Sequence, residues 1–357
     1  MKIGLVRRGY SRTGGAEAYL RRFAETAAEA GHGIVLFSEK WPAAEWPFEY
    51  AQVDSHSPGT FAAAMDAMRA RDRCDFLFSL ERISTCDCYR AGDGVHAAWL
   101  ERRARFEPAW KAWFRHFSRK HREFLALEKE LFGPRGARAV IANSAMVRDE
   151  IVKYFHYPAD RIHVIHNGVP PPKVAPEDRT ARRTSLGLKS DDCAFLFAGS
   201  GWERKGLRFA VEAINEAKLD QAKLLIAGRG NPRSLPRCAP ARFLGPVKDM
   251  PTLLAAADVF ILPTIYDPFS NACLEALAAG LPVITTAQNG FSEIIESGVE
   301  GEIIAEPNDI PALARAIQDW SDPARRATAK PRLATLSARY TIAENVRQTL
   351  AAIQSMR

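Results

Sequence analysis

Residues 259–286, VFILPTIYDPFSNACLEALAAGLPVITT, decide the fold class of this chain. They begin and end with short apolar runs, VFILP and LPVITT, in which polar and apolar residues do not alternate. Unbroken apolar runs of this length are typical of strands that are buried on both faces of a parallel sheet. The residues between them predict a loop and then a helix, which Ser270 or Asn271 can cap. Strand, helix and strand form a βαβ unit, so this stretch predicts an α/β protein.

The same alternation of buried strand and helix occurs in both halves of the chain. Apolar runs predict strands at 2–6, 32–38, 76–80 and 139–143 in the first half, and at 194–199, 222–228, 259–263, 281–286 and 301–305 in the second. Between the halves, the proline-rich and charged stretch 162–180 breaks the pattern and is the best linker candidate. Two consecutive βαβ arrays predict two doubly wound domains that face each other across a cleft. We place them at 1–168 and 169–340, followed by an amphipathic C-terminal helix at 341–357.

Length and composition indicate a cytoplasmic protein with an anionic partner. At 357 residues, of which 47% are hydrophobic, the chain can form two packed domains and is too apolar for a disordered protein. It has no apolar run of the roughly 20 residues that a membrane-spanning helix needs, and no signal-peptide core. Six scattered cysteines predict no disulfide framework, and Cys86 and Cys88 lack a second ligand pair for a metal. The net charge of +7 favours nucleic acid, an anionic membrane or phosphorylated substrates.

Two strand-to-helix turns carry residues suited to an anion. Gly14 and Gly15 follow the first predicted strand, and glycines there let main-chain N–H groups approach a phosphate at the helix start. The pattern is not the GxGxxG fingerprint, which argues against nicotinamide chemistry, and a tight structural turn explains it as well. In the second half, Arg204 and Lys205 precede Gly206 in the corresponding turn. Two cations beside a helix start can clamp a diphosphate, although an exposed basic loop would have the same sequence.

Two acids, Asp267 and Glu275, flank the start of the helix predicted in the opening stretch. Glu275 lies among small and apolar residues and therefore needs a partner, which a pair of sugar hydroxyl groups can provide. Paired acids also occur in glycosidases, where one carboxyl group protonates the leaving group. Hydrolysis gives no reason for a phosphate-binding turn beside the acids, whereas transfer from a nucleotide diphosphate sugar explains both features.

The segment DPFSNACLEALAAGLPVI, together with the ERKG loop and the GGAE start, resembles the retaining glycosyltransferases that have the GT-B fold. The resemblance covers essentially the whole chain. It implies an α/β architecture of two Rossmann-like domains across a cleft, with the C-terminal helix packing back on the N-terminal domain. That family has an acid, seven residues, a glutamate and then a small-residue helix. It usually has glutamate at the first of these positions, where this chain has Asp267, which is one methylene shorter.

The resemblance also assigns roles to the residues of this segment. Asp267 would contact the donor hexose, and Glu275 would bind the ribose hydroxyl groups. Main-chain N–H groups near three residues would face the sugar and the phosphate, namely Phe269, Ser270 and Asn271. The acids would thus recognise hydroxyl groups, and the start of the helix would recognise phosphate.

In the N-terminal half, YRAGDGVHAAWLERR at 89–103 resembles the loop through which relatives direct an acid or a histidine at the donor sugar. Asp93 and His96 are the candidates, and an ordinary loop aspartate and a surface histidine are the alternatives. The chain lacks the D-x-D metal-binding pair of the other common glycosyltransferase fold. We therefore expect neither a required metal nor any cofactor besides the nucleotide-sugar donor.

Residues 99–132, WLERRARFEPAWKAWFRHFSRKHREFLALEKELF, combine aromatic residues at helical spacing with basic residues. Such a pattern suits a helix at the surface of an anionic membrane. A core helix with a charged solvent face is the alternative; nucleic-acid binding also fits the composition, but no recognised module accompanies it. The segment resembles the membrane-facing region of lipopolysaccharide core glucosyltransferases, which act on a lipid-anchored, phosphorylated acceptor at the inner bacterial membrane. The residues assigned to the membrane are Trp110, Trp113, Arg115, Arg119, Lys120 and Arg122.

Together these features predict a cytoplasmic glycosyltransferase that is peripheral on the inner membrane. It would move a hexose, glucose from UDP-glucose, with retention onto a lipopolysaccharide core acceptor, and it would bind no nucleic acid. Arg204 and Lys205 would stabilise the departing diphosphate. Two other functions fit the sequence. One is a related transferase that uses another UDP- or GDP-sugar for capsule or glycolipid synthesis, and the other is a non-catalytic nucleotide-sugar or membrane-binding scaffold.

Overall fold

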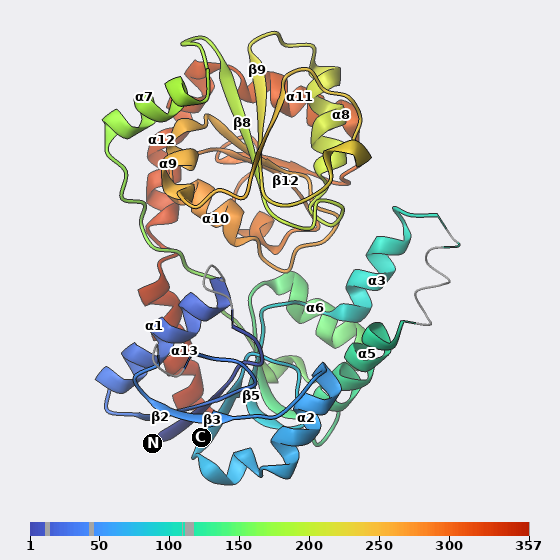
Figure 1. Cartoon of the computed structure of the whole chain (residues 1–357), viewed down its shortest axis with the longest axis vertical. Coiled ribbons are helices and arrows are strands. Elements are labelled where there is room, and N and C mark those ends of the chain that lie inside the picture. The colour runs from blue at the N-terminus through green and yellow to red at the C-terminus, as the bar shows by residue number, and fades with distance from the viewer. Residues whose placement is uncertain (11–14, 43–45, 109, 111–117, 357) are drawn as a thin grey trace. The chain divides into compact units, whose positions relative to one another are not determined.

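The computed structural model describes residues 1–10, 15–42, 46–108, 110 and 118–356. The chain forms two compact units, Met1–His166 together with the C-terminal segment from Ile342, and Asn167–Thr341. Each unit contains one parallel sheet with helices packed against it (Figure 1). The predicted α/β fold with two Rossmann-like units is therefore confirmed.

The first unit contains a seven-stranded sheet in the order β3-β2-β1-β4-β5-β6-β7, in which every neighbouring pair is parallel. Its strands are β1 (Lys2–Val6), β2 (Gly33–Ser38), β3 (Glu49–Gln52), β4 (Phe76–Ser79), β5 (Cys86–Ala91), β6 (Ala137–Ala142) and β7 (Ile162–Val164). The apolar runs of the sequence predict β1, β2, β4 and β6 but not the other three strands. The order reverses between β1 and β4, and the carboxyl ends of strands at such a point are where doubly wound sheets bind ligands.

The missed strand β5 is fully buried although it contains two charged residues. Asp87 forms an ion pair with Arg71 at 2.5 Å, and the guanidinium of Arg90 lies 4.0 Å from the ring centroid of Tyr19. These partners compensate for the loss of water around the two charges. Because the charges interrupt the apolar pattern, periodicity alone does not reveal this strand.

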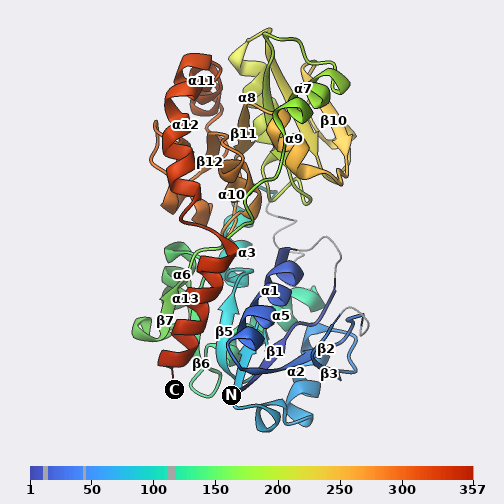
Figure 2. The ribbon, with the colours of Figure 1, turned by 90° about the vertical axis from the view of Figure 1, so that its left-hand side faces the viewer.

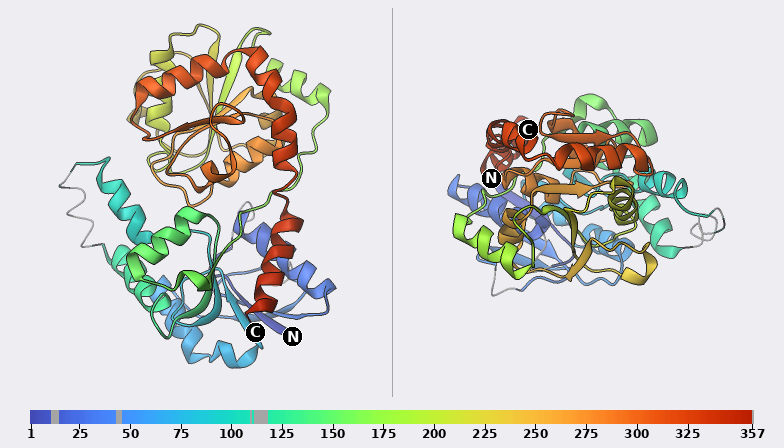
Figure 3. Two further views of the ribbon diagram at one scale, coloured as in Figure 1. Left: turned by 180° about the vertical axis from the view of Figure 1, so that it is seen from behind. Right: turned by 90° about the horizontal axis from the view of Figure 1, so that it is seen from above.

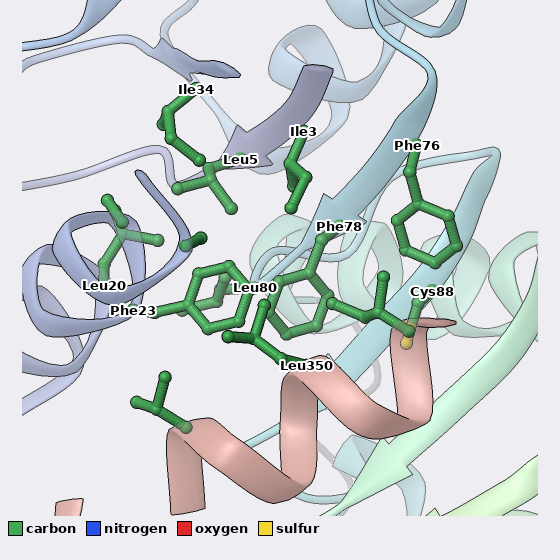
Figure 4. Packing of buried hydrophobic residues seen from close by; sticks show 14 of the residues in the cluster. Ile3, Leu5, Leu20, Phe23, Ile34, Phe76, Phe78, Leu80, Cys88 and Leu350 are labelled. Atoms are coloured by element: carbon green, nitrogen blue, oxygen red, sulfur yellow. The ribbon is translucent and has the colours of Figure 1, made fainter. Parts of the chain in front are cut away.

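The helices of the first unit are α1 (Gly15–Glu29), α2 (Pro58–Ala67), α3 (His96–Ala104), α5 (Arg119–Leu131), α6 (Ala145–Phe155) and α13 (Ile342–Ser355), with short 3-10 helices η2 (Ala70–Arg73) and η3 (Ala159–Arg161). α13 lies beside α1, at the opposite end of the sequence (Figure 2). Leu350 of α13 packs into one core with Leu5 and Phe23 (Figure 4), and the Tyr19 hydroxyl lies 3.3 Å from Thr349 Oγ1. The C-terminal helix therefore packs back on the N-terminal unit, as expected.

The segment 99–132 is not one continuous helix in the described residues. α3 ends at Ala104, and α5 begins at Arg119 with Ser118 as its N-cap residue. The inner face of α5 is buried, whereas Arg119, Lys120 and Arg122 are exposed on its first turn. Two of the residues assigned to the membrane, Trp113 and Arg115, lie outside the described part of the chain.

The second unit contains a six-stranded parallel sheet in the order β10-β9-β8-β11-β12-β13. Its strands are β8 (Cys193–Ala198), β9 (Ala222–Ala227), β10 (Ala241–Gly245), β11 (Val259–Leu262), β12 (Val283–Thr286) and β13 (Gly301–Ile304). The sequence predicts all of them except β10, an edge strand whose residues are exposed or half-buried. The order reverses between β8 and β11, so the loops that follow these two strands meet at the switch point of the sheet.

The helices of this unit are α7 (Pro176–Ser185), α8 (Leu207–Ala217), α9 (Met250–Ala256), α10 (Asn271–Ala278), α11 (Ile310–Trp320) and α12 (Pro323–Ser337), with short 3-10 helices η4 (Pro232–Ser234) and η5 (Gly290–Ile294). α11 and α12 lie together on one face of the sheet (Figure 3). Among the helices in the described part of the chain, none combines the length and the apolarity needed to cross a bilayer.

Candidate active site

Asp267 stands in the loop between β11 and α10, at the switch point of the second sheet. Its main-chain N–H donates to the Gln288 carbonyl at 2.9 Å, and its own carbonyl accepts from the Gly290 N–H at 2.9 Å. These two bonds tie the loop to the residues that follow β12. The main chain at Asp267 is therefore held by hydrogen bonds from both its N–H and its carbonyl group.

Arg204 and Lys205 reach the same carboxylate from the loop that follows β8. Lys205 Nζ forms an ion pair with Asp267 Oδ2, and Arg204 Nη1 lies 3.7 Å from that oxygen. Arg204 Nη1 also donates to the Tyr266 carbonyl at 3.1 Å. The structure thus brings together three of the predicted site residues, from two loops that are 62 positions apart in the sequence.

Lys205 and Arg204 differ in how far their side chains are buried. The Lys205 side chain is 13% exposed and that of Asp267 is 7% exposed, whereas Arg204 is 36% exposed. The reading of both cations as an exposed basic loop is therefore wrong for Lys205. The backbone explains the difference, because Gly206 has φ +73° and a Cβ atom there would lie 1.8 Å from the Pro263 carbonyl oxygen. Only glycine permits this close approach, which presses Lys205 against the loop of Asp267.

The N-terminus of α10 is organised by a residue that the sequence does not single out. Asn289 is fully buried, and its Oδ1 accepts from the N–H groups of Ser270 at 3.1 Å and Phe291 at 3.2 Å. Ser270 Oγ in turn caps the helix by accepting from the Cys273 N–H. The Ser270 N–H is therefore engaged within the protein. Asn289 and the glycine after it form a turn signature, which is the only signal that marks this position in the sequence.

The first turn of α10 still presents free donors. The N–H groups of Asn271 and Ala272 have no acceptor among the described residues. The Asn271 side chain accepts from Asn167 Nδ2 at 2.8 Å, and the ring of Phe269 is buried against Phe291. Free N–H groups at a helix start favour an anion.

Glu275 lies one turn further along α10 and is exposed, between the buried residues Leu274 and Ala276. The surrounding protein displaces part of its water and raises the pKa of its carboxyl group. Its carboxylate has no hydrogen-bond or ion-pair partner among the described residues. An exposed carboxylate with both oxygens free can accept hydrogen bonds from two hydroxyl groups.

In the first unit, Asp93 and His96 follow β5, and Asp93 is exposed. His96 begins α3, and its Nε2 lies 3.0 Å from His121 Nδ1 of α5. Burial, and then the charge of Arg82, lowers the pKa of His96 to about 4. The imidazole is therefore neutral at physiological pH.

The switch point of the first sheet holds a charged cluster that no local sequence pattern reveals. Arg7, which follows β1, contacts Glu17 in α1 at 3.2 Å and Glu81, which follows β4, at 2.9 Å. Burial raises the pKa of Glu81. Gly15 is the first residue of α1, and Gly14 lies outside the described residues. The acid of the GGAE sequence thus pairs within the protein.

Comparison with known families decides what kind of enzyme carries this site. Glycosyltransferase Family 4 matches residues 13–172, and Glycosyl transferases group 1 matches residues 192–322. The two matches cover the two units in turn. The chain is a glycosyltransferase of this type.

The chain is similar to three other proteins. It is 32% identical to the uncharacterised glycosyltransferase MJ1607 of Methanocaldococcus jannaschii, over 51% of each chain, so the match spans about half of that relative. It is 25% identical to the lipopolysaccharide glucosyltransferase WaaG of Escherichia coli K12, over 82% of each chain. The crystal structure of WaaG superposes with a TM-score of 0.81 over 98% of this chain and 99% of WaaG, at 22% identity. HepE of Anabaena in complex with UDP-glucose superposes with a TM-score of 0.74 over 99% and 100% of the chains, at 20% identity.

No three His, Cys, Asp or Glu side chains gather as a metal site in the part of the glycosyltransferase that the structure describes. Cys86 and Cys88 are buried in β5 as free thiols. Metal independence stays a prediction, because the sequence argument for it rests on the missing D-x-D pair.

Proposed function

We propose that this glycosyltransferase moves glucose from UDP-glucose, with retention, onto a lipopolysaccharide core acceptor. The observation that carries the proposal is the contact of Lys205 and Arg204 with Asp267 at the switch point of the second sheet. Similarity to WaaG, a lipopolysaccharide glucosyltransferase, supports the acceptor. The complex of HepE with UDP-glucose supports the donor, since the two proteins share a fold.

The roles of the donor-site residues follow from their charge and exposure. Two cations face one carboxylate, which leaves one positive charge to stabilise the diphosphate as it departs. Arg204 is the more exposed cation and contacts the diphosphate first. Glu275, with both oxygens free, takes the ribose hydroxyl groups, and Asp267 takes the hexose. The free N–H groups at the start of α10 add hydrogen bonds to phosphate oxygens.

In the first unit, Asp93 and His96 are proposed to contact the transferred sugar. The neutral His96 imidazole suits hydrogen bonds to hydroxyl groups better than it suits an ion pair with phosphate. We propose no metal and no cofactor besides the donor. The chemistry assigned to this chain is charge stabilisation and positioning.

The proposed site of action is the cytoplasmic surface of the inner membrane. Arg119, Lys120 and Arg122 are exposed on the first turn of α5, Leu125 is exposed on the next turn, and Trp110 is 60% exposed. Basic residues beside exposed apolar groups bind anionic headgroups and the acyl boundary together. A lipid-anchored acceptor would then be concentrated where the enzyme sits.

A donor and acceptor screen tests this proposal. Purified protein is incubated with each UDP- or GDP-sugar and with lipopolysaccharide cores of increasing length, and products are identified by mass spectrometry. We expect transfer from UDP-glucose alone, and the proton coupling of the new anomeric centre should show the configuration of the donor. Transfer from a different sugar nucleotide would favour the related transferase, and binding of UDP-glucose without turnover would favour the scaffold.

A pair of arginine variants shows whether turnover depends on the assigned site. Arg204→Ala should lower kcat by about 10²-fold or more, the loss expected when one charge-stabilising donor is removed. Arg208→Ala is the matched control, because Arg208 is 56% exposed on α8 and pairs with Glu212 at 3.4 Å. Equal rates in the two variants would contradict the diphosphate assignment.

A further inference from the structure

The start of α3 is capped by a carboxylate from a distant helix. Its N-cap residue is Val95, whose side chain has no oxygen and therefore makes no side-chain cap hydrogen bond. Instead, the His96 N–H donates to Glu128 Oε1 at 2.5 Å, and the Ala97 N–H donates to Glu128 Oε2 at 3.2 Å. Glu128 belongs to α5, about 30 residues later.

The same carboxylate forms a buried ion pair with Arg82. Arg82 Nε lies 3.0 Å from Glu128 Oε1, and the two side chains are 8% and 0% exposed. Arg82 Nη2 also donates to the Gly94 carbonyl at 2.7 Å. One ion pair therefore holds the main chain on both sides of Val95, at Gly94 and at His96.

Stability alone does not explain a buried pair of this kind. Replacing a buried ion pair with well-packed apolar residues is often neutral or stabilising, because both charges lose their water on burial. A serine or aspartate at position 95 would cap the helix locally. What the pair supplies, and apolar residues cannot, is three hydrogen bonds to the main chain that carries Asp93 and His96.

We propose that Arg82 and Glu128 are positioning residues, which fix the 93–97 loop so that Asp93 and His96 meet the transferred sugar. The inference rests on the proposed function for the role of Asp93 and His96. Arg82 follows β4 and Glu128 lies in α5, so two segments outside the 93–97 loop hold it in place.

The experiment compares the double variant Arg82→Met/Glu128→Leu with the parent. The apolar pair keeps the core filled and removes only the polar clamp. We expect a melting temperature close to that of the parent, unchanged UDP affinity, and kcat lower by about 10²-fold, the scale of a 1 Å misplacement of reacting groups. Amide hydrogen exchange at His96 and Ala97 should be faster by about tenfold or more, because each loses a charge-assisted hydrogen bond.

Two further variants keep the test decisive. Glu128→Gln preserves one carbonyl acceptor in the same shape and should restore part of kcat and of the exchange protection. If the double variant does not fold, this single variant carries the comparison. The control is Lys2→Ala/Glu49→Ala, an exposed ion pair of the same unit at 2.8 Å, which should leave kcat and the exchange at His96 unchanged.

The outcomes separate the inference from the proposed function. A folded double variant with the kcat of the parent, or with unchanged exchange at His96 and Ala97, would overturn the positioning role. A parent enzyme that fails to use any sugar nucleotide would overturn the proposed function instead. Amide exchange requires no substrate and decides in that case whether the pair holds the loop.

Discussion

Removing Lys205 should destabilise the second unit much more than removing its partner Asp267. Lys205→Ala leaves a 7% exposed carboxylate whose remaining cation, Arg204, lies 3.7 Å away. Breaking a buried ion pair from one side costs about 3–5 kcal/mol. Arg204 offsets part of that cost, so we expect a loss of about 2–3 kcal/mol.

The opposite deletion is milder because the two side chains differ in reach. Asp267→Ala leaves a lysine whose four-carbon stem can carry its ammonium group to water, and we expect a loss of about 1 kcal/mol. The double variant should lose about 1–2 kcal/mol, so that the two changes are not additive. For a unit of this size, each kcal/mol shifts the melting temperature by about 2–4 °C. Lys205→Ala should therefore melt about 5–10 °C below the parent.

Thermal and urea melts of the parent, both single variants and the double variant measure this coupling. A second cycle, on the i,i+4 pair of Arg208 and Glu212 on α8, serves as the control, since that pair lies at 3.4 Å but its side chains are 56% and 34% exposed. Its coupling should be only about 0.3–0.5 kcal/mol. If the Lys205 and Asp267 effects add within about 0.5 kcal/mol, or if Lys205→Ala melts like the parent, the buried pair of Lys205 and Asp267 is not formed in solution.

Three further outcomes are expected. Calorimetry should show weaker UDP binding for Glu275→Ala and unchanged UDP binding for Asp267→Ala, because Glu275 is assigned to the ribose and Asp267 to the hexose. An equal loss of UDP affinity in both variants would refute this assignment. Replacing the basic membrane residues with glutamine should release the protein from anionic vesicles in a sedimentation assay, since each basic residue near such a surface contributes about 1 kcal/mol of binding free energy. The parent protein should likewise bind poorly to neutral vesicles, or to anionic vesicles at high salt. The residues to replace are Arg115, Arg119, Lys120 and Arg122. NMR titration should show that His96 stays neutral in the folded protein down to pH about 4. The unfolded chain takes up the same proton near pH 6.5, so the free energy of unfolding should fall as the pH drops from 6.5 to 4. His96→Ala should reduce this loss.

The sequence predicts the strands of this fold wherever burial is purely apolar. It misses β5, because Asp87 and Arg90 are buried with partners that come from elsewhere in the chain. It also misses β3, β7 and β10, which lie at the edges of the two sheets and are only partly buried. Hydrophobic periodicity marks polar residues as exposed to solvent. It therefore fails to predict a strand whose polar residues are buried against side chains from distant parts of the chain.

The same reason limits what the sequence reveals about the site. Local patterns identify Arg204, Lys205 and Asp267, because each stands at a strand end beside a helix start. They do not identify Asn289 or Glu128, which act on helix starts 19 and 32 residues away. Nor do they show that Lys205 is buried, because that depends on the approach of Gly206 to Pro263.

The last helix of the chain has a consequence for how the protein is synthesised. The second unit is contiguous in sequence, so it can fold as soon as Thr341 has left the ribosome, whereas the core of the first unit is completed only by Val346, Leu350 and Ile353 of α13. At about 5–20 residues per second, the 187 residues between His166 and Ile353 (353 − 166) take about 10–40 s to translate. Throughout that time the nascent first unit lacks part of its core and presents apolar surface to chaperones. A message truncated after the codon for Thr341 should accordingly yield aggregated protein rather than a shorter transferase.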